Sequence, residues 1–340
     1  MALLNLGDLT LEELTEYMKS IGESAFRGKQ IFEWIARGAE SLDDCTNLSK
    51  ALREKLSRDA EIYLPKVYKK LISKLDGTVK YLFELRDGNL VESVVMSYHH
   101  GYSICISSQV GCRMGCTFCA STLNGLVRNL TSAEISGQVI AAQKDMGVEI
   151  SNIVVMGIGE PFDNYDNIIK FLKNVNDPTG LGIGWRHITL STCGLADKIR
   201  RFAGENMPIN LALSLHAPED GLRREMMPVA KAYTIDETLA ACDEYFQKTG
   251  RRVTFEYALS EKNGSLAQAQ KLVELLKDRN CHVNLIPVNP VRERNYVRSD
   301  KKSVAAFMDY LNKNGVNSTL RRELGSDISA SCGQLRNSEI

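Results

Sequence analysis

The sequence of 340 residues predicts an α/β protein: a partial TIM-like (β/α)6 barrel with an N-terminal helical domain and a β-meander extension. Three observations support this fold class. Helical periodicity dominates the first 60 residues, period-two alternation follows from about 65 to 107, and apolar strands then alternate with capped helices. We therefore expect a helical domain over residues 1–62, a meander over 63–101, a barrel over 102–324 and a tail over 325–340.

The N-terminal segment is predicted to form helices. Leu11, Leu14, Met18 and Ile21 recur at the spacing of one helix face, and a second such run extends from Phe26 to Ile35. Its basic residues are offset by many acids, so two roles stay open: a bundle that only packs on the main domain, and one that contacts a nucleic acid.

Two Asp-Gly turns, Asp76-Gly77 and Asp87-Gly88, separate alternating segments and predict hairpins. The predicted strands are Lys66–Lys74, Val79–Arg86, Leu90–Tyr98 and Tyr102–Ser107. On the third strand Glu92 shares a face with Val94, so its carboxylate points either to solvent or into a site.

Beyond residue 130, capped helices alternate with short apolar strands, which is typical of a parallel sheet. Capping boxes at Thr131 and Thr234 each place a Glu three residues later, and Ser265 opens another helix. The predicted strands are Asn152–Gly157, His187–Thr192, Asn210–Leu215, Arg252–Leu259, His282–Ile286 and Asn317–Arg321. Six or seven strands fit a partial barrel.

The carboxyl ends of these strands are unusually polar, and in such barrels the chemistry lies at that rim. The candidate binding residues there are Gly159, Glu160, Ser191, Ser214, Leu215, His216 and Asn289. For single residues such as Thr192 and Asn289, a helix cap or turn is an equal alternative. His216 either lines the pocket or is an ordinary buried imidazole.

Cys112, Cys116 and Cys119 lie within eight positions and indicate a metal site. Structural zinc prefers four protein ligands, and no second Cys-x-x-Cys pair follows. A four-iron cluster held by three thiolates leaves one iron open to a small molecule, so the spacing favours catalysis. A zinc site completed by a distant His or Cys is the alternative. Phe118 is expected to shield the metal from water.

Composition is that of an ordinary globular protein, with 44% hydrophobic and 25% charged residues. No apolar run approaches membrane-helix length and the N-terminus is not signal-like, so we expect a cytoplasmic protein without membrane contact. Nine cysteines, an odd number, then indicate free thiols and a metal. The formal net charge of zero gives no support for a nucleic-acid partner.

Cys332 lies on the tail and is followed by Gly333, so it is placed for chemistry, although a lone tail cysteine is usually incidental. Cys105, seven residues before Cys112, is equally ambiguous. The cluster spacing with an aromatic before its last cysteine resembles the radical S-adenosylmethionine (SAM) superfamily. With it, further segments resemble the RlmN/Cfr family of radical SAM RNA methyltransferases: Cys105–Cys119, Gly159–Pro161, Ser214–Ala217, Asn284–Val291 and Arg321–Leu335.

Within that family the sequence is more similar to the RlmN branch, because Pro161 follows Gly-Glu where the Cfr branch usually has Ala. Two departures are small: Ser331 replaces a usual Ala, and Ser121-Thr122 stands where Thr-Gly is common. The resemblance implies one 4Fe-4S cluster on Cys112, Cys116 and Cys119, and SAM bound by the rim residues.

The resemblance also implies a reaction at carbon 2 of adenine, which is too electron-poor for polar methyl transfer. One SAM methylates Cys332, and a radical made from a second SAM activates that methyl group for addition to the base. Cys105 then releases the RNA through a transient disulfide with Cys332. Glu92 matches the family's proton acceptor, and its division of the base role with Cys105 stays open.

The implied substrates are an adenine of 23S ribosomal RNA in the peptidyl-transferase centre and the adenine 3′ to the anticodon of transfer RNAs. We expect an electron donor such as flavodoxin or ferredoxin, a monomer, and a flipped or unpaired base. The basic segment 292–302 is either an RNA contact or a solvated loop. Two rivals remain: a Cfr-type carbon-8 methyltransferase conferring antibiotic resistance, and a non-catalytic metal-binding RNA module.

Overall fold

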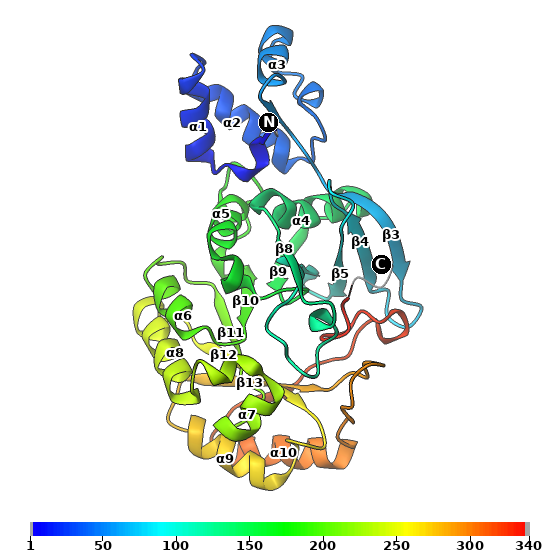
Figure 1. Cartoon of the computed structure of the whole chain (residues 1–340), viewed down its shortest axis with the longest axis vertical. Coiled ribbons are helices and arrows are strands. Elements are labelled where there is room, and N and C mark those ends of the chain that lie inside the picture. The colour runs from blue at the N-terminus through cyan, green and yellow to red at the C-terminus, as the bar shows by residue number, and fades with distance from the viewer. Residues whose placement is uncertain (1–2, 337–340) are drawn as a thin grey trace.

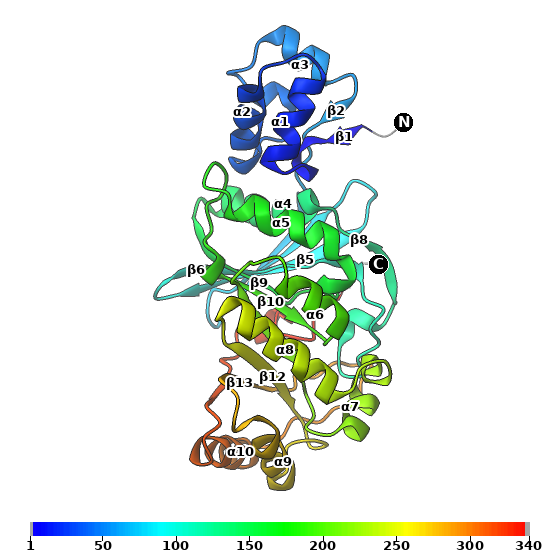
Figure 2. The same ribbon diagram turned by 90° about the vertical axis from the view of Figure 1, so that its left-hand side faces the viewer.

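The N-terminal residues form a separate lobe at one end of the long axis of the molecule (Figures 1 and 2). The structure, a computed structural model, describes residues 3–336. The lobe contains α1 (Leu11–Ser20), α2 (Ala25–Ala36), α3 (Lys50–Leu56) and the parallel pair β1 (Leu4–Asn5) and β2 (Ala60–Glu61). Leu14, Met18 and Ile31 lie in its own hydrophobic core. The predicted helices are confirmed, whereas the strand pair was missed because two-residue strands have no periodicity.

A ten-stranded sheet forms the rest of the framework, in the order β14-β13-β12-β11-β10-β9-β6-β5-β4-β3. Its strands are β3 (Lys66–Ile72), β4 (Val79–Glu84), β5 (Leu90–Tyr98), β6 (Gly101–Cys105), β9 (Ile150–Val155), β10 (Ile188–Thr192), β11 (Asn210–Ser214), β12 (Val253–Leu259), β13 (Cys281–Pro287) and β14 (Ser318–Leu320). The seven from β6 to β14 are parallel, and β3–β5 continue the same sheet in antiparallel fashion. The predicted α/β fold with parallel strands is confirmed, and the meander is an extension of the barrel sheet.

The helices that connect the parallel strands are α4 (Ser132–Met146), α5 (Tyr165–Asn176), α6 (Ala196–Ala203), α7 (Asp220–Met226), α8 (Ile235–Thr249), α9 (Leu266–Leu276) and α10 (Lys301–Lys313). Both predicted capping boxes are present: the hydroxyls of Thr131 and Thr234 each accept from the backbone amide of the Glu three residues later, and the carboxylate of that Glu accepts from the Thr backbone amide. Both helices end at a glycine with positive φ.

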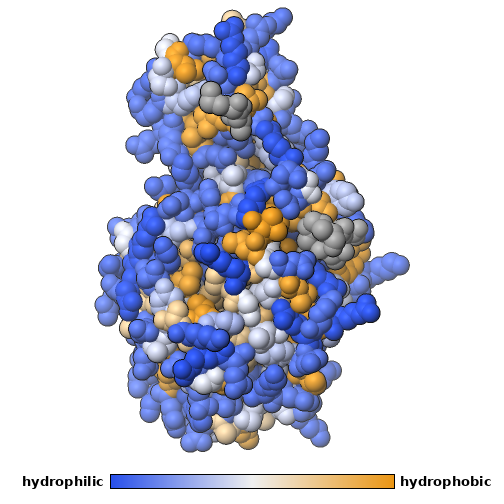
Figure 3. All heavy atoms as spheres, viewed as in Figure 1, coloured by the Kyte–Doolittle hydropathy of each residue, from blue (hydrophilic) through white to orange (hydrophobic). Residues whose placement is uncertain are grey.

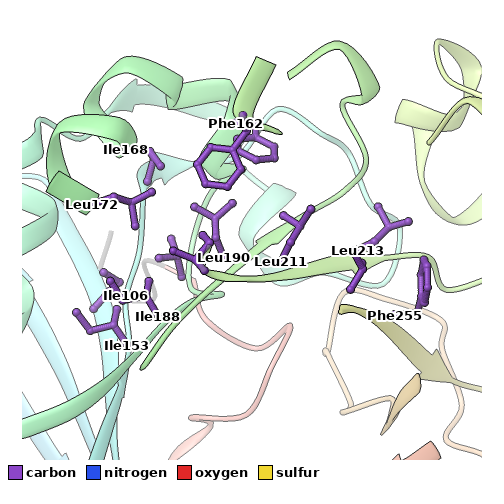
Figure 4. Packing of buried hydrophobic residues seen from close by; sticks show 14 of the residues in the cluster. Ile106, Ile153, Phe162, Ile168, Leu172, Ile188, Leu190, Leu211, Leu213 and Phe255 are labelled. Carbon is purple, nitrogen blue, oxygen red and sulfur yellow. The ribbon is translucent and has the colours of Figure 1, made fainter. Parts of the chain in front are cut away.

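The main core fills the space between these helices and the sheet (Figure 4). Ile168 and Leu172 of α5 point toward Ile153 of β9 and Ile188 of β10. All four side chains are fully buried. On the face of the molecule seen in Figure 1 most of the surface is hydrophilic, with hydrophobic side chains gathered over the N-terminal lobe and near the centre of the view (Figure 3). None of the helices within residues 3–336 is long and apolar enough to cross a membrane.

A hairpin that the sequence analysis missed holds the cysteine loop at its base. Its strands are β7 (Gln109–Gly111) and β8 (Leu126–Asn129), and the loop with the three cysteines lies between them. Gly111 has φ of 74°, and a Cβ there would lie 2.0 Å from the Gly125 carbonyl oxygen. Only glycine therefore allows this close crossing, which lets the amide of Cys112 donate to Gly125 at 2.8 Å.

Candidate active site

A cavity of about 170 Å³ opens at the carboxyl ends of the parallel strands. It collects predicted site residues from six separate segments of the chain: Cys112, Cys116, Cys119, Gly159, Glu160, Ser191, Ser214, His216, Asn289 and Cys332. Three other predicted residues lie outside its walls. Leu215 is fully buried in the hydrophobic core. Glu92 and Cys105 lie beside the cavity, on the face of strands β5 and β6 that the C-terminal tail covers.

The three loop cysteines border one side of this cavity. Cys112 and Cys116 are buried and Cys119 is half-buried. Burial raises the pKa of the Cys112 thiol to about 12 and that of Cys116 well above its usual value. The site therefore needs a cationic group to hold these sulfurs as thiolates. Across residues 3–336 no three ligand-type side chains converge on a single-ion site. Thiols placed around a volume suit a cluster, whose ligands bind different irons.

Phe118 packs inside this region as the sequence predicts for a shielding aromatic. Its ring meets His216 edge-on at a centroid distance of 4.9 Å and Tyr296 at 6.0 Å. The Tyr296 hydroxyl lies 2.6 Å from Thr117 Oγ1, and Arg294 Nη2 donates to Thr122 Oγ1 at 2.8 Å. The segment proposed to contact RNA thus uses two of its members to cover the cysteine loop.

Glu160 lies at the wall of the cavity, held by backbone amides. Its carboxylate accepts from Cys193 N at 2.7 Å and from Phe162 N at 3.1 Å. Burial raises the pKa of this carboxyl, and the backbone bonds from Cys193 and Phe162 oppose that shift. The preceding Gly159 has φ of 109°, and a Cβ there would lie 2.6 Å from Ser108 Oγ. Glycine is therefore required for this chain path.

On the strands that follow, hydroxyl and imidazole groups face the same space. Ser191 and Ser214 place their Oγ atoms 3.4 Å apart. His216 adopts φ of 57° and its Nδ1 accepts from Ala258 N at 3.0 Å. Burial lowers the pKa of His216 to about 3, so the ring is neutral and carries its proton on Nε2. The open choice for His216 is resolved: it is buried and it also lines the cavity.

Three charged residues add to the candidate binding residues at this site. Arg223 on α7 is fully buried and donates to Cys193 O at 2.7 Å and Leu215 O at 3.2 Å, which ties together the ends of β10 and β11. Glu256 is buried on β12, and burial raises its pKa. Arg321 lines both this cavity and a smaller one beside Cys332. Glu256 and Arg321 belong to the polar strand ends that the sequence predicts for the rim, whereas Arg223 was missed because nothing local in the sequence marks it.

Cys332 reaches the cavity because the tail folds back over the rim. Asn289 Nδ2 donates to the Cys332 carbonyl at 3.0 Å, and the amide of Ala120 donates to Gly333 at 2.9 Å. Cys105 lies nearby under the tail, packed with Ala330 and Leu335. Burial and the nearby Cys332 raise the pKa of Cys105 to about 12. Both thiols are unpaired in this structure.

Glu92 is fully buried, so its solvent-facing alternative is wrong. Its Oε1 lies 2.8 Å from Lys80 Nζ, and its Oε2 accepts from the Arg336 amide at 2.7 Å. Burial raises the pKa of this carboxyl, and Lys80 opposes the shift. In register, Val94 lies opposite both Lys80 and Cys105. Glu92, two residues from Val94, therefore faces the same side as Cys105.

Comparisons with known proteins agree with this geometry. Residues 4–62 match the model of the ribosomal RNA large subunit methyltransferase (RlmN) N-terminal domain, and residues 106–260 match the radical SAM superfamily. A protein of Clostridium novyi named "Probable dual-specificity RNA methyltransferase RlmN" is 54% identical over 99% of this chain and 98% of its own. A protein of the same name from Alkaliphilus oremlandii is 55% identical over the same shares of the two chains. The crystal structure of a radical SAM methyltransferase from Sphaerobacter thermophilus superposes with a TM-score of 0.93 at 41% identity, covering 98% of this chain and all of that one.

Proposed function

The chain belongs to the RlmN family of radical SAM RNA methyltransferases, and from this premise we propose how its own residues carry out the reaction. The substrates proposed are an adenine of 23S ribosomal RNA in the peptidyl-transferase centre and the adenine 3′ to the anticodon of transfer RNAs. Carbon 2 of the base receives the methyl group. One observation carries the proposal: Cys332, the proposed methyl carrier, lines the same cavity as Cys112, Cys116 and Cys119.

The family implies a 4Fe-4S cluster and SAM, and the residues of the cavity fit both. The thiolates of Cys112, Cys116 and Cys119 would hold three irons of the cluster, and the fourth iron would take the amino and carboxylate groups of SAM. Glu160 would accept a hydrogen bond from the amino group of SAM, and Ser191, Ser214 and Asn289 would meet its carboxylate and ribose. His216, being neutral, places no second cation beside the sulfonium. A cluster bound there would, once reduced, supply the electron for cleavage of SAM to a deoxyadenosyl radical.

Cys332 acts as the methyl carrier in this proposal. Its thiolate takes a methyl group from one SAM, and the deoxyadenosyl radical from a second SAM removes a hydrogen atom from that group. The carbon radical adds to carbon 2, which joins the RNA covalently to the Cys332 sulfur. Two SAM molecules are therefore used in each turnover. Because the tail reaches the cavity from outside the barrel, the same sulfur is able to face both SAM and RNA.

Release needs a base and a second thiol. Glu92, whose carboxylate faces the side of the sheet covered by the tail, is the proposed proton acceptor. Removal of the proton from carbon 2, with transfer of the adduct's unpaired electron to a one-electron acceptor, restores the aromatic ring. The Cys105 thiolate then attacks the Cys332 sulfur, the bond between that sulfur and the methylene carbon breaks, and this carbon takes up a proton to become the methyl group as the disulfide forms and the RNA leaves. The packing of Cys105 against the tail supports this pairing. Reduction of the disulfide then resets both thiols.

The remaining features follow from this chemistry. The adenine edge is accessible only when the base is unpaired or flipped, so we propose a loop substrate. The electron donor is proposed to be flavodoxin or ferredoxin, and the protein to act in the cytoplasm as a monomer. Exposed Arg292 and Arg298, on the segment whose Arg294 and Tyr296 cover the cysteine loop, are the proposed RNA-backbone contacts.

Peptide mass spectrometry of the tail tests the carrier role. Anaerobic protein with a reconstituted cluster is incubated with SAM bearing a deuterated methyl group, without RNA and then with it. We expect the label on Cys332 in the first sample and on RNA in the second. An unlabelled Cys332 beside methylated RNA would contradict the proposal. A carbon-8 product would instead place the enzyme in the Cfr branch.

A further inference from the structure

Lys80 and Glu92 form an ion pair inside the protein. Lys80 is 4% exposed and Glu92 is fully buried, and Nζ lies 2.8 Å from Oε1. The two residues lie on neighbouring strands β4 and β5 as a diagonal pair on one face, because Glu92 is opposite Leu82, two residues from Lys80. Removing two charges from water is expensive, and such a pair is often no more stable than apolar residues of the same size. The pair therefore calls for a role other than stability.

Both members of this pair also bind the tail that carries Cys332. Lys80 Nζ donates to the Ser329 carbonyl at 3.2 Å, and Glu92 Oε2 accepts from the Arg336 amide at 2.7 Å. The first contact lies three residues before Cys332 and the second lies four residues after it. Figure 1 shows this C-terminal segment running beside the meander strands. The ion pair thus forms hydrogen bonds with the tail on both sides of the Cys332 sulfur.

The bound conformation of the tail is not one that the chain would adopt unaided. Ser329 has φ of 51°, a left-handed conformation that is uncommon for residues other than glycine. The amide of Ala330 donates to Gly325, and Ser331 Oγ donates to the Leu324 carbonyl at 3.1 Å, so the segment turns back on itself. The bond from Lys80 falls on the carbonyl of the left-handed residue itself. It is therefore positioned to select this turn.

We propose that Lys80 is a positioning residue that links the Glu92 carboxylate to the tail and so places Cys332 between the cavity and Cys105. This inference rests on the proposed function of Glu92 and Cys332 and extends it to a residue outside the cavity. The register supports the geometry, because Lys80, Val94 and Cys105 form one row across β4, β5 and β6. Ala330 and Leu335 of the tail pack on the same face.

The link also couples the base to the position of the tail. The charged groups around the Glu92 carboxylate are the Lys80 ammonium from β4 and Arg336 from the tail, and Arg336 pairs with Glu293 from the loop after β13 at 2.6 Å. Lys80 favours the anionic form of Glu92, whereas burial favours the neutral acid. When Glu92 accepts a proton, both its ion pair and its acceptor for the Arg336 amide weaken. Proton uptake thereby loosens the tail, as release of the RNA requires.

Hydrogen–deuterium exchange of the tail amides, followed by mass spectrometry, tests this inference. Lys80→Met removes both contacts of the ammonium, and Lys80→Gln keeps a donor for the tail but no charge. Lys66→Met, an exposed lysine on β3, is the matched control. A hydrogen bond to a charged group contributes enough for tail exchange in Lys80→Met to rise about tenfold. Lys80→Gln should show a smaller rise, and the control none.

The pH profile of RNA methylation gives a second readout that a purely structural role would not move. Both Lys80→Met and Lys80→Gln remove the positive charge beside Glu92. The acid limb of the pH profile of methylation should therefore move upward by about one pH unit or more in these two variants. Lys80→Arg should restore part of both effects. Unchanged tail exchange together with an unchanged acid limb in both neutral variants would overturn the inference. If the wild-type protein methylates no RNA, the proposed function fails, and the exchange comparison alone still decides whether Lys80 holds the tail.

Discussion

Replacement of Glu160 by Gln tests the proposed SAM site most sharply. Both carboxylate oxygens are already used by the chain, since one accepts from Cys193 N at 2.7 Å and the other from Phe162 N at 3.1 Å. A Gln side chain has only one acceptor oxygen, so its NH2 group would face one of these amides. The variant therefore loses the negative charge and one buried hydrogen bond at the same time.

The size of the effect follows from these contacts. A hydrogen bond from the amino group of SAM to the charged Glu160 carboxylate contributes about 1.5–3 kcal/mol. Since about 1.4 kcal/mol corresponds to a tenfold change, SAM should bind Glu160→Gln about 10- to 150-fold more weakly. The assay is anaerobic equilibrium dialysis with labelled SAM, on protein whose iron content matches that of the wild type.

Asp163→Asn is the matched control, because this carboxylate lies in the same loop and binds Gln109 and Arg113 away from the cavity walls. Its affinity for SAM should stay within about twofold of the wild-type value. Equal affinity of Glu160→Gln and wild type, at equal iron content, would refute the reasoning. So would an equally large loss in the control.

Two further variants and a pH profile address the release step, the fold and the base. Cys105→Ala should accumulate RNA covalently bound to Cys332, seen as a shifted band on a denaturing gel, and free product at the wild-type rate would contradict this. Arg223→Met should lower the free energy of unfolding by about 3–5 kcal/mol, because the buried carbonyls of Cys193 and Leu215 lose their donor. A loss below about 1 kcal/mol in denaturant titrations would show that these hydrogen bonds do not hold the two strand ends together. Burial raises the pKa of Glu92, so its base form disappears as pH falls through a value above the usual carboxyl range, and RNA methylation should decline there. An acid limb at an ordinary carboxyl pKa would exclude Glu92 as the base.

The strand ends show why much of the cavity could be predicted. Parallel strands all end at one edge, so polar residues that follow them, such as Glu160 and Ser214, meet without any knowledge of side-chain packing. The cysteine spacing also predicts its site without knowledge of packing, because three thiols so close together in one loop are expected to bind one metal centre. The strand boundaries were less accurate, as β14 ends at Leu320 rather than Arg321.

Other residues depended on contacts that sequence pattern does not contain. Glu92 alternates with apolar neighbours, and its burial is decided by Lys80 on the next strand and by Arg336 on a tail 244 residues later. Arg223 lies on a helix of seven residues, too short for a clear period, and a charged side chain is ordinarily expected at the surface. The fold of the tail over the cavity likewise rests on long-range bonds, such as that between Asn289 and Cys332.

The central claim is that Cys332 carries a methyl group to carbon 2 of an RNA adenine. Mass spectrometry of nucleosides from ribosomal and transfer RNA, after anaerobic incubation with SAM and a reductant, tests it most directly beside Cys332→Ala. The account predicts 2-methyladenosine with the wild-type protein and none with the variant, while both retain the cluster. Methylation that survives in Cys332→Ala, or the absence of any RNA methylation by cluster-loaded wild type, would contradict it.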